Sequence, residues 1–270
     1  MQMTNAMKGF NVVTGATGGL GGAFVELLAE RGEPLILTGR SEEKLTALKE
    51  RLLERYHGLI VECFACDLTD ETERKLFIYD IKKACGEYGM PVFRLLNVAG
   101  ADIQKAVRDY TQEKIAFQCR ANFEGAVSLC HGMLPLGVKE IVNISSVSGI
   151  YPMPYFAIYS AAKGALTSFS LALREELKGE VKVTAILPGA IPTREDVKAQ
   201  IKGQGLWGKL AAKKPAFVAK KALAAVKKNK GKAVIGFANK LMNFGTKFIP
   251  LKLKLKFIAK RWCKISKDAF

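Results

Sequence analysis

A tyrosine and a lysine at helical spacing are the residues of this chain whose types could move a proton together. In the segment Tyr159-Ser-Ala-Ala-Lys163 both side chains fall on one face of a predicted helix, and Ser146 lies upstream of them. Because a nearby cation favours a tyrosinate, we expect Lys163 to lower the pKa of the Tyr159 phenol from its ordinary value of about 10. The Ser146 hydroxyl could hold a carbonyl oxygen where negative charge develops. These three residues predict general acid–base chemistry on a carbonyl or an alcohol.

A glycine-rich segment follows the first predicted strand, residues 10–14, and precedes a helical pattern over residues 19–31. It reads Thr14-Gly15-Ala16-Thr17-Gly18-Gly19-Leu20-Gly21. Glycines here allow a tight turn and let the backbone approach a pyrophosphate, and the helix N-terminus offers free N–H groups to the phosphates. A strand, a glycine turn and a helix in this order make such a motif credible. The segment therefore predicts a dinucleotide site, and the alternative is a plain glycine-rich turn.

The second predicted strand, residues 34–38, is followed by Gly39, Arg40 and Ser41. A site for NAD(H) usually has an acid near this point, hydrogen-bonded to the ribose, and this chain has Gly39 there. An arginine is a good planar donor to a phosphate group. We therefore expect NADP(H) rather than NAD(H). The alternative is that Arg40 only caps a surface turn.

Further segments with the character of a dinucleotide enzyme occur in order along the chain. They are Asp67-Leu68, Asn97-Val98-Ala99-Gly100, Asn122 and Pro188-Gly189-Ala190-Ile191-Pro192-Thr193. Together with the glycine-rich segment and with Ser146, Tyr159 and Lys163, they resemble the short-chain dehydrogenase/reductase family over about residues 8–195. One position departs from the pattern, because Val98 stands where the family usually has a second asparagine.

The resemblance implies a role for each of these residues. Tyr159 would donate and accept the proton, and Lys163 would hold the nicotinamide ribose and depress the pKa of the phenol. Ser146 would bind the substrate oxygen, and Asn122 would position a water that relays protons to Lys163. The cofactor contacts expected from the resemblance and from the motifs above are Thr14, Gly15, Thr17, Gly19, Leu20, Gly21, Arg40, Ser41, Asp67, Leu68, Asn97, Ala99, Gly100, Tyr159, Lys163, Pro188, Gly189, Ile191 and Thr193.

Strand-like runs alternate with helical runs over most of the chain. The predicted strands cover residues 10–14, 34–38, 59–64, 92–97, 139–145, 181–187 and 232–236, and the most distinct helices cover residues 19–31, 42–55, 104–134 and 156–178. Alternating βα units with apolar strands predict an α/β fold, a doubly wound Rossmann-type parallel sheet flanked by helices on both faces. We expect a catalytic domain over residues 1–239 and a basic amphipathic C-terminal extension over residues 240–270. The resemblance also implies a homodimer built on the helices near 104–134 and 156–178.

Composition narrows the class of protein. No long apolar run precedes the first strand, and no stretch of roughly 18 apolar residues occurs, so we expect neither a signal peptide nor a spanning helix. Cys63 and Cys66 fall in a predicted strand and are interpreted as buried thiols. His57 and His131 lie far from each other in the sequence, so we expect no metal site. The cytoplasm is the expected compartment, with peripheral attachment to the inner face of a membrane considered below.

The net charge of +17 is concentrated at the C-terminal end. Residues 201–270 contain 19 Lys and Arg and one acid, a balance of +18, whereas residues 1–200 contain 23 Lys and Arg and 24 acids, a balance of −1. Apolar residues from Phe237 to Trp262 interleave with these cations. The pattern is typical of a helix on an anionic lipid surface. Two other interpretations remain: an arm packed on the body or on a second subunit, and a nucleic-acid contact, although no recognised nucleic-acid module is present.

The segments expected to border the substrate are largely apolar. They are residues 149–156 and the loop that contains Leu206, Trp207 and Leu210. We therefore predict an NADP(H)-dependent oxidoreductase that interconverts a ketone and a secondary alcohol on a lipophilic substrate, of the hydroxysteroid or bile-acid dehydrogenase type. The alternative among enzymes is a 3-oxoacyl (fatty acyl) reductase. The alternative outside enzymes is a protein that binds a dinucleotide without turnover and interacts through its basic extension.

Overall fold

A parallel sheet forms the centre of the computed structural model, which describes residues 9–193, 195, 197, 201 and 212–263. Seven strands in this part of the chain pair in the order β3-β2-β1-β4-β5-β6-β7. They are β1 (Phe10–Thr14), β2 (Leu35–Gly39), β3 (Val61–Ala65), β4 (Val92–Asn97), β5 (Glu140–Ile144), β6 (Lys182–Leu187) and β7 (Lys232–Val234). In the register of the central strands, Val12 of β1 pairs with Ile36 of β2 and Leu95 of β4. The strand order reverses between β1 and β4, and a crevice for a ligand is expected outside the carboxyl ends at that point.

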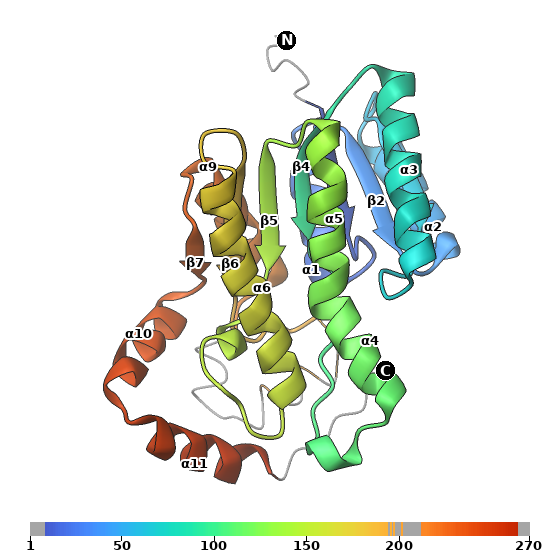
Figure 1. Ribbon diagram of the computed structural model, residues 1–270. Helices are drawn as coiled ribbons and strands as arrows, with labels where there is room; N and C mark the ends of the chain where they lie inside the picture. The colour runs from blue at the N-terminus through green and yellow to red at the C-terminus, as the bar shows by residue number, and fades with distance from the viewer. Residues whose placement is uncertain (1–8, 194, 196, 198–200, 202–211, 264–270) are drawn as a thin grey trace.

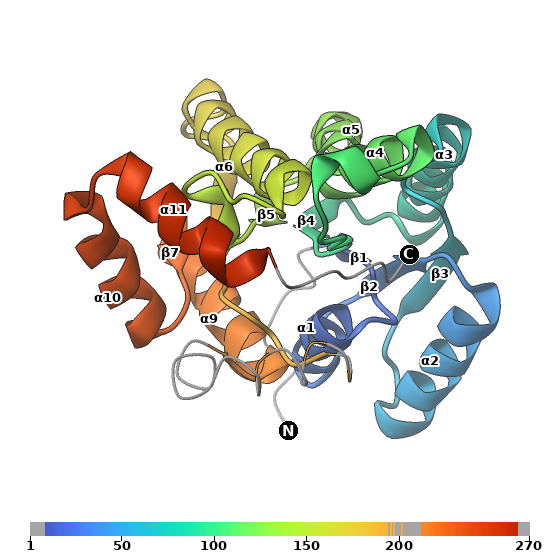
Figure 2. The same ribbon diagram turned by 90° about the horizontal axis from the view of Figure 1, so that it is seen from below.

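Helices cover both faces of the sheet (Figures 1 and 2). The described helices are α1 (Gly19–Ala29), α2 (Glu42–Arg55), α3 (Glu71–Tyr88), α4 (Gln112–Cys119), α5 (Gly125–Met133), α6 (Ala157–Glu176), α9 (Pro215–Lys227), α10 (Phe237–Gly245) and α11 (Leu251–Trp262). One apolar core joins the sheet to α1, α2 and α9, and a second joins it to α3, α5 and α6. The predicted doubly wound α/β fold is confirmed.

Local sequence explains where the helices beside the site begin. The Ser41 hydroxyl accepts a hydrogen bond from the backbone N–H of Lys44 over 3.2 Å, so Ser41 caps α2. The Asp70 carboxylate does the same for the N–H of Glu73 over 2.9 Å and caps α3. At the other end α3 stops at Gly89, whose φ of 62° is left-handed and easily adopted by glycine.

The prediction of a single regular helix over residues 104–134 is wrong, because the helix starts later and a π-helical turn interrupts it. Helix α4 begins only at Gln112, because Thr111 is extended and its hydroxyl accepts from the N–H of Lys114 over 3.3 Å. A short 3₁₀ turn, Val107–Asp109, lies in the loop before it. A π-helical turn, Arg120–Glu124, then joins α4 to α5. The periodicity of apolar residues detected the helix but not its N-cap or its π-helical turn.

The C-terminal arm, defined here as Phe237–Cys263, extends from β7 and runs below the sheet (Figure 1). It consists of α10, the 3₁₀ turn Thr246–Phe248 and α11, which starts after Pro250. Because α10 begins at Phe237, the expected division between residues 239 and 240 falls inside a helix. Seen from below, α11 crosses the carboxyl ends of the strands between α6 and α9 (Figure 2). Among the described residues, no helix combines the length and the apolar character needed to cross a membrane.

Candidate active site

A cavity of about 1080 Å³ opens at the carboxyl ends of the strands. Its wall includes the glycine-rich segment after β1, the loops after β2 to β6, the start of α6 and the arm. The glycine-rich segment and the Tyr159 and Lys163 side chains therefore line one space, although they are far apart in the sequence. This is the position that the switch in strand order predicts for a ligand.

The glycines of the loop after β1 are required by close packing. Gly15 has a φ of 62°, and a Cβ there would lie 3.1 Å from the Cα of Ala99. A Cβ on Gly21 would overlap the carbonyl oxygen of Gly15, and one on Gly19 would lie 2.7 Å from the Thr193 Cγ2. No side chain caps the N-terminus of α1, which begins at Gly19 and faces the cavity. Its first N–H groups can therefore serve as donors to a phosphate.

Three of the expected cofactor residues, Thr14, Ser41 and Asn97, do not line the cavity. The Thr14 hydroxyl accepts hydrogen bonds from the N–H groups of Val98 (2.9 Å) and Ala99 (3.0 Å). It thereby ties the end of β1 to the loop after β4. Ala99 and Gly100 line the cavity, so Thr14 positions residues of the site without reaching into the cavity.

The Asn97 side chain points into the core between β4 and β5. Its Nδ2 donates to the Asn143 Oδ1 over 2.8 Å, and the Asn143 Nδ2 donates to the Ser170 hydroxyl on α6 over 2.9 Å. All three residues are buried. This chain of hydrogen bonds fixes α6 against the sheet below the catalytic segment, since a buried polar group without a partner is costly.

At the end of the cavity near β2, one of the two residues expected near an adenosine ribose lines the wall. Arg40 lines the cavity and is exposed, whereas Ser41 does not line it and is used as the cap of α2. A Cβ at Gly39 would lie 3.2 Å from the Thr17 hydroxyl, so a larger residue at position 39 would crowd the glycine-rich loop.

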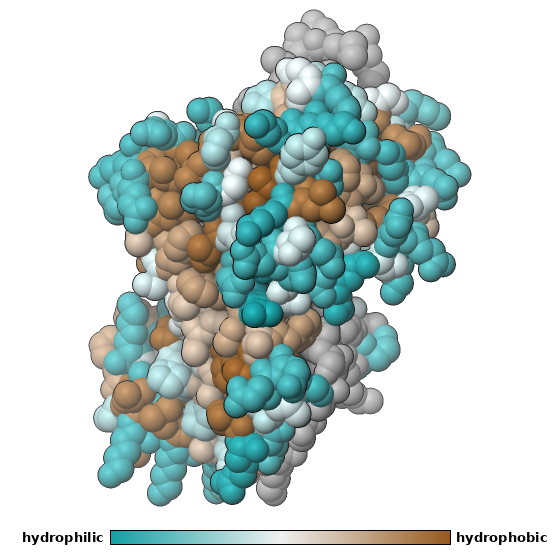
Figure 3. Space-filling model, turned by 45° about the vertical axis from the view of Figure 1, so that its right-hand side comes forward, coloured by the Kyte–Doolittle hydropathy of each residue, from teal (hydrophilic) through white to brown (hydrophobic). Residues whose placement is uncertain are grey.

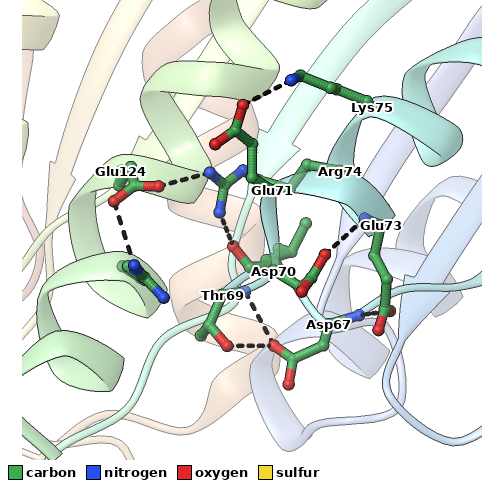
Figure 4. A network of polar contacts seen from close by, with 10 residues as sticks. Asp67, Thr69, Asp70, Glu71, Glu73, Arg74, Lys75 and Glu124 are labelled. Carbon is green, nitrogen blue, oxygen red and sulfur yellow. Dashed lines mark hydrogen bonds and ion pairs between the residues drawn. The ribbon is translucent and has the colours of Figure 1, made fainter. Parts of the chain in front are cut away.

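The turn after β3 is held by a polar network that Figure 4 shows. The Asp67 Oδ1 accepts from the N–H (2.9 Å) and the hydroxyl (2.8 Å) of Thr69, and the Asp67 N–H donates to the Glu73 Oε2 over 2.7 Å. Asp67 and Leu68 both line the cavity. The carboxylate is therefore fixed in orientation at the place expected for the adenine.

Arg74 links this turn to the helix that carries Asn122. Its guanidinium is buried and donates to the Leu68 carbonyl over 2.8 Å and to the Glu124 carboxylate over 2.5 Å (Figure 4). Glu124 belongs to the π-helical turn. A buried charge requires such pairing, so Arg74 couples the turn after β3 to the π-helical turn that contains Asn122.

Asn122 lies inside the π-helical turn, and π-bulges occur frequently at functional sites. Its Nδ2 donates to the carbonyls of Ala101 (2.6 Å) and Gln118 (2.9 Å), and its Oδ1 accepts from the Ala101 N–H over 3.2 Å. A Cβ on Gly100 would lie 2.8 Å from this Oδ1 and 3.2 Å from the Lys163 Nζ. Gly100 therefore lets the asparagine and the lysine converge. The Asn122 side chain positions the loop after β4, and the water relay stays a prediction.

Tyr159, Lys163 and Ser146 meet at the wall of the cavity, and the helical spacing predicts this for Tyr159 and Lys163. The Lys163 Nζ lies 5.8 Å from the centre of the Tyr159 ring and donates to the Ile144 carbonyl over 2.9 Å. The phenol is hydrogen-bonded to Ser146. On its other side the Tyr159 ring stacks on Phe156, with 4.3 Å between ring centroids.

The direction of the tyrosine pKa shift differs from the expectation. Burial raises the pKa of the Tyr159 phenol, the negative charge of Asp102 adds to this, and the hydrogen bond from Ser146 acts in the opposite sense. Burial also lowers the pKa of Lys163 to about 8, while Asp102 acts to raise it. The net shift of the phenol pKa is therefore upward, opposite to the expected direction, and burial is its largest cause.

Two supporting residues were not singled out from the sequence. The Ser145 hydroxyl donates to the backbone carbonyl of Lys163 over 2.7 Å and contacts the Thr167 hydroxyl at 2.7 Å, which holds α6 against the end of β5. A Cβ on Gly149 would lie 2.7 Å from the Lys163 carbonyl carbon, so the loop can approach α6 this closely only with glycine there. In the sequence, the only signals for these two supporting roles were the position of Ser145 next to Ser146 and the glycine at position 149.

The structure describes only some of the residues expected to border the nicotinamide and the substrate. Pro188, Gly189, Ile191 and Thr193 line the cavity, and so do Tyr151, Met153 and Phe156 from the segment 149–156. Leu206, Trp207 and Leu210 lie outside the described residues. The residues of the arm that line the cavity are Ala238, Asn239, Met242, Thr246, Ile249, Leu253, Lys254, Phe257, Ile258, Arg261 and Trp262. The sequence pattern did not indicate that the arm forms part of this wall.

The cysteines and histidines in the described part of the chain form no metal-binding cluster. No group of three or more His, Cys, Asp or Glu side chains there could hold a metal ion. Cys66 is buried and Cys63 is partly buried. Burial raises the pKa of the Cys63 thiol to about 11 and that of Cys66 to about 12, which keeps both thiols protonated and unreactive.

Asp102 gives a direct test of the electrostatics. It lines the cavity after Gly100, and its charge raises the pKa of both Tyr159 and Lys163. Asp102→Asn removes this charge, so the pKa of the phenol should fall. If the phenol is the acid that protonates a ketone, the alkaline limb of the pH–rate profile for reduction should move to lower pH.

The matched control for Asp102→Asn is Asp109→Asn, which removes an equal charge from the same loop outside the cavity wall. The control should leave the pH–rate profile in place. An alkaline limb that does not move in Asp102→Asn, or that moves equally in both variants, would contradict the role of Asp102.

Comparisons with known proteins identify the family of this chain. The model of the short chain dehydrogenase family matches residues 10–202. Serine 3-dehydrogenase of Agrobacterium fabrum is 34% identical over 199 residues, which cover 69% of this chain and 74% of that protein. Very-long-chain 3-oxoacyl-CoA reductase of Bos taurus is 33% identical over 198 residues, which cover 68% of this chain and 59% of that protein.

A solved structure of a 7beta-hydroxysteroid dehydrogenase shares the fold, with a TM-score of 0.78 and 22% sequence identity over 93% of this chain and 96% of that chain. The family match covers more than half of the chain, and it spans the glycine-rich loop and the Ser146, Tyr159 and Lys163 positions. The resemblance found in the sequence is confirmed, and this chain belongs to the short chain dehydrogenase family.

Proposed function

We propose that this short-chain dehydrogenase is an NADP(H)-dependent oxidoreductase that interconverts a ketone and a secondary alcohol on a lipophilic substrate. The observation that carries the proposal is the convergence of Tyr159, Lys163, Ser146 and Asn122 at one end of a cavity whose other end is the glycine-rich loop. A dinucleotide that bridges the two ends would bring its reactive ring to the tyrosine. The cofactor supplies the hydride, and the protein supplies orientation and protons.

Each catalytic side chain has a distinct task in this proposal. In reduction, the Tyr159 phenol donates its proton to the developing alkoxide oxygen, and its raised pKa keeps it protonated at neutral pH. The Ser146 hydroxyl donates a hydrogen bond to the same oxygen. Lys163 holds the ribose hydroxyls, and Asn122 fixes the loop that borders both. In oxidation the proton moves in the opposite direction.

The preference for NADP(H) rests on the residues after β2. Arg40 lines the cavity beside Gly39, and no acid stands at that position to repel a 2′-phosphate. A guanidinium can bind a phosphate through two parallel hydrogen bonds. This supports NADP(H) as the cofactor.

A lipophilic substrate is favoured by the composition of the catalytic end of the cavity. Met153, Phe156 and Ile258 form a small apolar cluster there, and Tyr151 and Trp262 pack against it. Such a wall suits a steroid, a bile acid or a long acyl chain. The relative named very-long-chain 3-oxoacyl-CoA reductase supports 3-oxoacyl reduction as the second candidate, whereas the relative named serine 3-dehydrogenase acts on a small polar substrate by its name.

We also propose a homodimer. Members of the family commonly form oligomers, and α4, α5 and α6 would supply the interface. Phe123 of the π-helical turn and Phe169 of α6 meet edge to face, with 6.3 Å between ring centroids, so these helices already pack as one unit. In this proposal the catalytic domain ends before Phe237, and the arm follows it.

A panel of steroid, bile-acid and 3-oxoacyl ketones, followed by the absorbance of NADPH, tests the function. We expect turnover of at least one lipophilic ketone, with kcat/KM at least tenfold above that for small polar carbonyl compounds, because about 25 cal/mol is gained for each Å² of apolar surface buried. Binding of NADPH without turnover of any ketone would instead support a non-catalytic dinucleotide-binding protein. Best turnover of a small polar carbonyl compound would contradict the substrate class.

A further inference from the structure

The arm is anchored on the body at both of its ends. At its start the Asn239 side chain is fully buried, and its Nδ2 donates to the Ile235 carbonyl over 2.7 Å. At its end the Trp262 ring stacks on Phe156, with 6.3 Å between ring centroids, and Phe156 in turn stacks on Tyr159. The arm therefore has a defined inner side, and its opposite side is fixed in orientation.

The outer side of α10 and of the 3₁₀ turn after it carries a row of aromatic and aliphatic side chains. Phe237, Leu241, Phe244 and Phe248 follow each other at the spacing i, i+4, i+7 and i+11, which places them on one helical face. Phe237 is 80% exposed and Phe248 is 74% exposed, and none of the four lines the cavity. Isolated exposed apolar residues are ordinary, but a contiguous row of this size marks an interaction surface.

The arm contains no acid, and Lys240 and Lys247 lie on the same two elements as this row. The basic residues of the arm are Lys240, Lys247, Lys252, Lys254, Lys256, Lys260 and Arg261. In the space-filling view, the lower end of the molecule, where α11 lies in Figure 1, has hydrophobic surface interrupted by hydrophilic side chains (Figure 3). Aromatic residues beside lysines are the composition of a surface that lies at a lipid headgroup layer.

Charge complementarity decides which occupant this surface fits. A second copy of the arm would bring lysines against lysines, because a twofold contact pairs the same patch on both subunits. An anionic membrane instead attracts each cation and accepts the aromatic rings at its interface, and one cation near such a surface strengthens binding by about fivefold. The balance of +18 over residues 201–270, against −1 over the rest, orients this end of the molecule toward a negative surface.

The same arm forms the mouth of the cavity. Leu253 and Phe257 of α11 line the cavity and are also exposed, Phe257 by 66%. Met242 and Ile249 line the cavity from α10 and the turn after it. An apolar substrate that approached the arm from a bilayer would therefore meet an apolar rim at the cavity.

We propose that the arm binds the surface of an anionic membrane through Phe237, Leu241, Phe244, Phe248 and the exposed lysines of the arm, and that this contact presents the cavity mouth to the bilayer. The lipophilic substrate then enters from the lipid phase. The membrane contact stands on the surface of the arm alone, and the route of entry rests on the proposed function.

Sedimentation of the full-length protein with vesicles tests the contact. Vesicles of phosphatidylcholine mixed with phosphatidylserine should pellet the protein at low salt, and vesicles of phosphatidylcholine alone should pellet much less. At about 1 M salt, where the Debye length is about 3 Å, most of the protein should be released. A protein that stays in the supernatant with phosphatidylserine vesicles at low salt would overturn the proposal.

Two double variants test whether vesicle binding depends on the arm or only on the overall positive charge of the protein. We expect vesicle binding to weaken by at least tenfold in each of these two double variants. One combines Phe237→Ser with Phe248→Ser, and the other combines Lys240→Glu with Lys247→Glu. Lys220→Glu with Lys228→Glu is the matched control, because it reverses the same charge at exposed positions of α9 and its C-cap. If the control weakens binding as much as Lys240→Glu with Lys247→Glu, the arm is not the binding surface.

Activity assays separate this proposal from the proposed function. The phenylalanine and lysine variants should keep turnover of a water-soluble ketone, and they should lose the rise in kcat/KM that vesicles give with a membrane-partitioned ketone. Vesicle binding without turnover of any ketone would reject the function and keep the membrane contact. A change of oligomeric state in the phenylalanine variant, measured by light scattering without vesicles, would instead assign the row to a second copy of the chain.

Discussion

Tyr159→Phe is expected to lower kcat for ketone reduction by about 10²–10⁴-fold, the range that a general acid typically contributes. The substitution removes only the hydroxyl, and the ring can keep its stack on Phe156, where the centroids are 4.3 Å apart. The fold and the affinity for NADPH should therefore change little. Steady-state kinetics with NADPH absorbance gives kcat, and the quenching of protein fluorescence by NADPH gives the affinity.

Tyr151→Phe is the matched control, because Tyr151 also lines the cavity and loses the same atom. We expect its kcat to stay within about threefold of the unmodified protein, since no role as an acid is assigned to it. Activity of Tyr159→Phe within that same range would reject Tyr159 as the proton donor. A parallel loss of NADPH affinity would mean that the hydroxyl supports the cofactor rather than the proton transfer.

Arg40→Ala is expected to weaken binding of NADPH by roughly ten- to a hundredfold and to leave NADH almost unchanged. The reason is the loss of a charge-assisted hydrogen bond to the 2′-phosphate, which contributes about 1.5–3 kcal/mol. Arg40 is exposed at the rim of the cavity, so its removal should not disturb the core. Titration of both cofactors, followed by fluorescence, measures the ratio of the two dissociation constants.

Arg40→Lys refines the test, because it keeps the charge and loses the planar pair of donors. Its affinity for NADPH should lie between those of the unmodified protein and Arg40→Ala. An equal loss for NADPH and NADH in Arg40→Ala would show that Arg40 supports the loop after β2, and the assignment of NADP(H) would then lack its basis.

Much of the fold could be predicted because its determinants are local. The apolar runs of β1 and β2 and the glycines at Gly15 and Gly21 identify a parallel sheet with a tight loop after the first strand. The spacing of Tyr159 and Lys163 placed both on one side of α6. In each case the geometry follows from residues a few positions apart, so the pattern is visible in the sequence.

Other features depend on neighbours that are distant in the chain. Thr14 and Asn97 fit the cofactor motif, yet their side chains bond to the backbone after β4 and to Asn143, because their directions are set by strand pairing and core packing. The start of α4 depends on the Thr111 cap, which outweighs the apolar periodicity before it. Periodicity alone does not reveal these contacts.

The sequence alone determined the family, the fold class, the convergence of Tyr159 with Lys163, and the basic C-terminal end, since these follow from residue types and short spacings. The tertiary structure decided the environment of the site. It buried the phenol enough to reverse the expected direction of its pKa shift, it brought Asp102 to the same wall, and it placed the arm across the cavity mouth with its aromatic row outward. Desolvation, charge proximity and packing depend on the whole folded chain, and no short segment of sequence contains them.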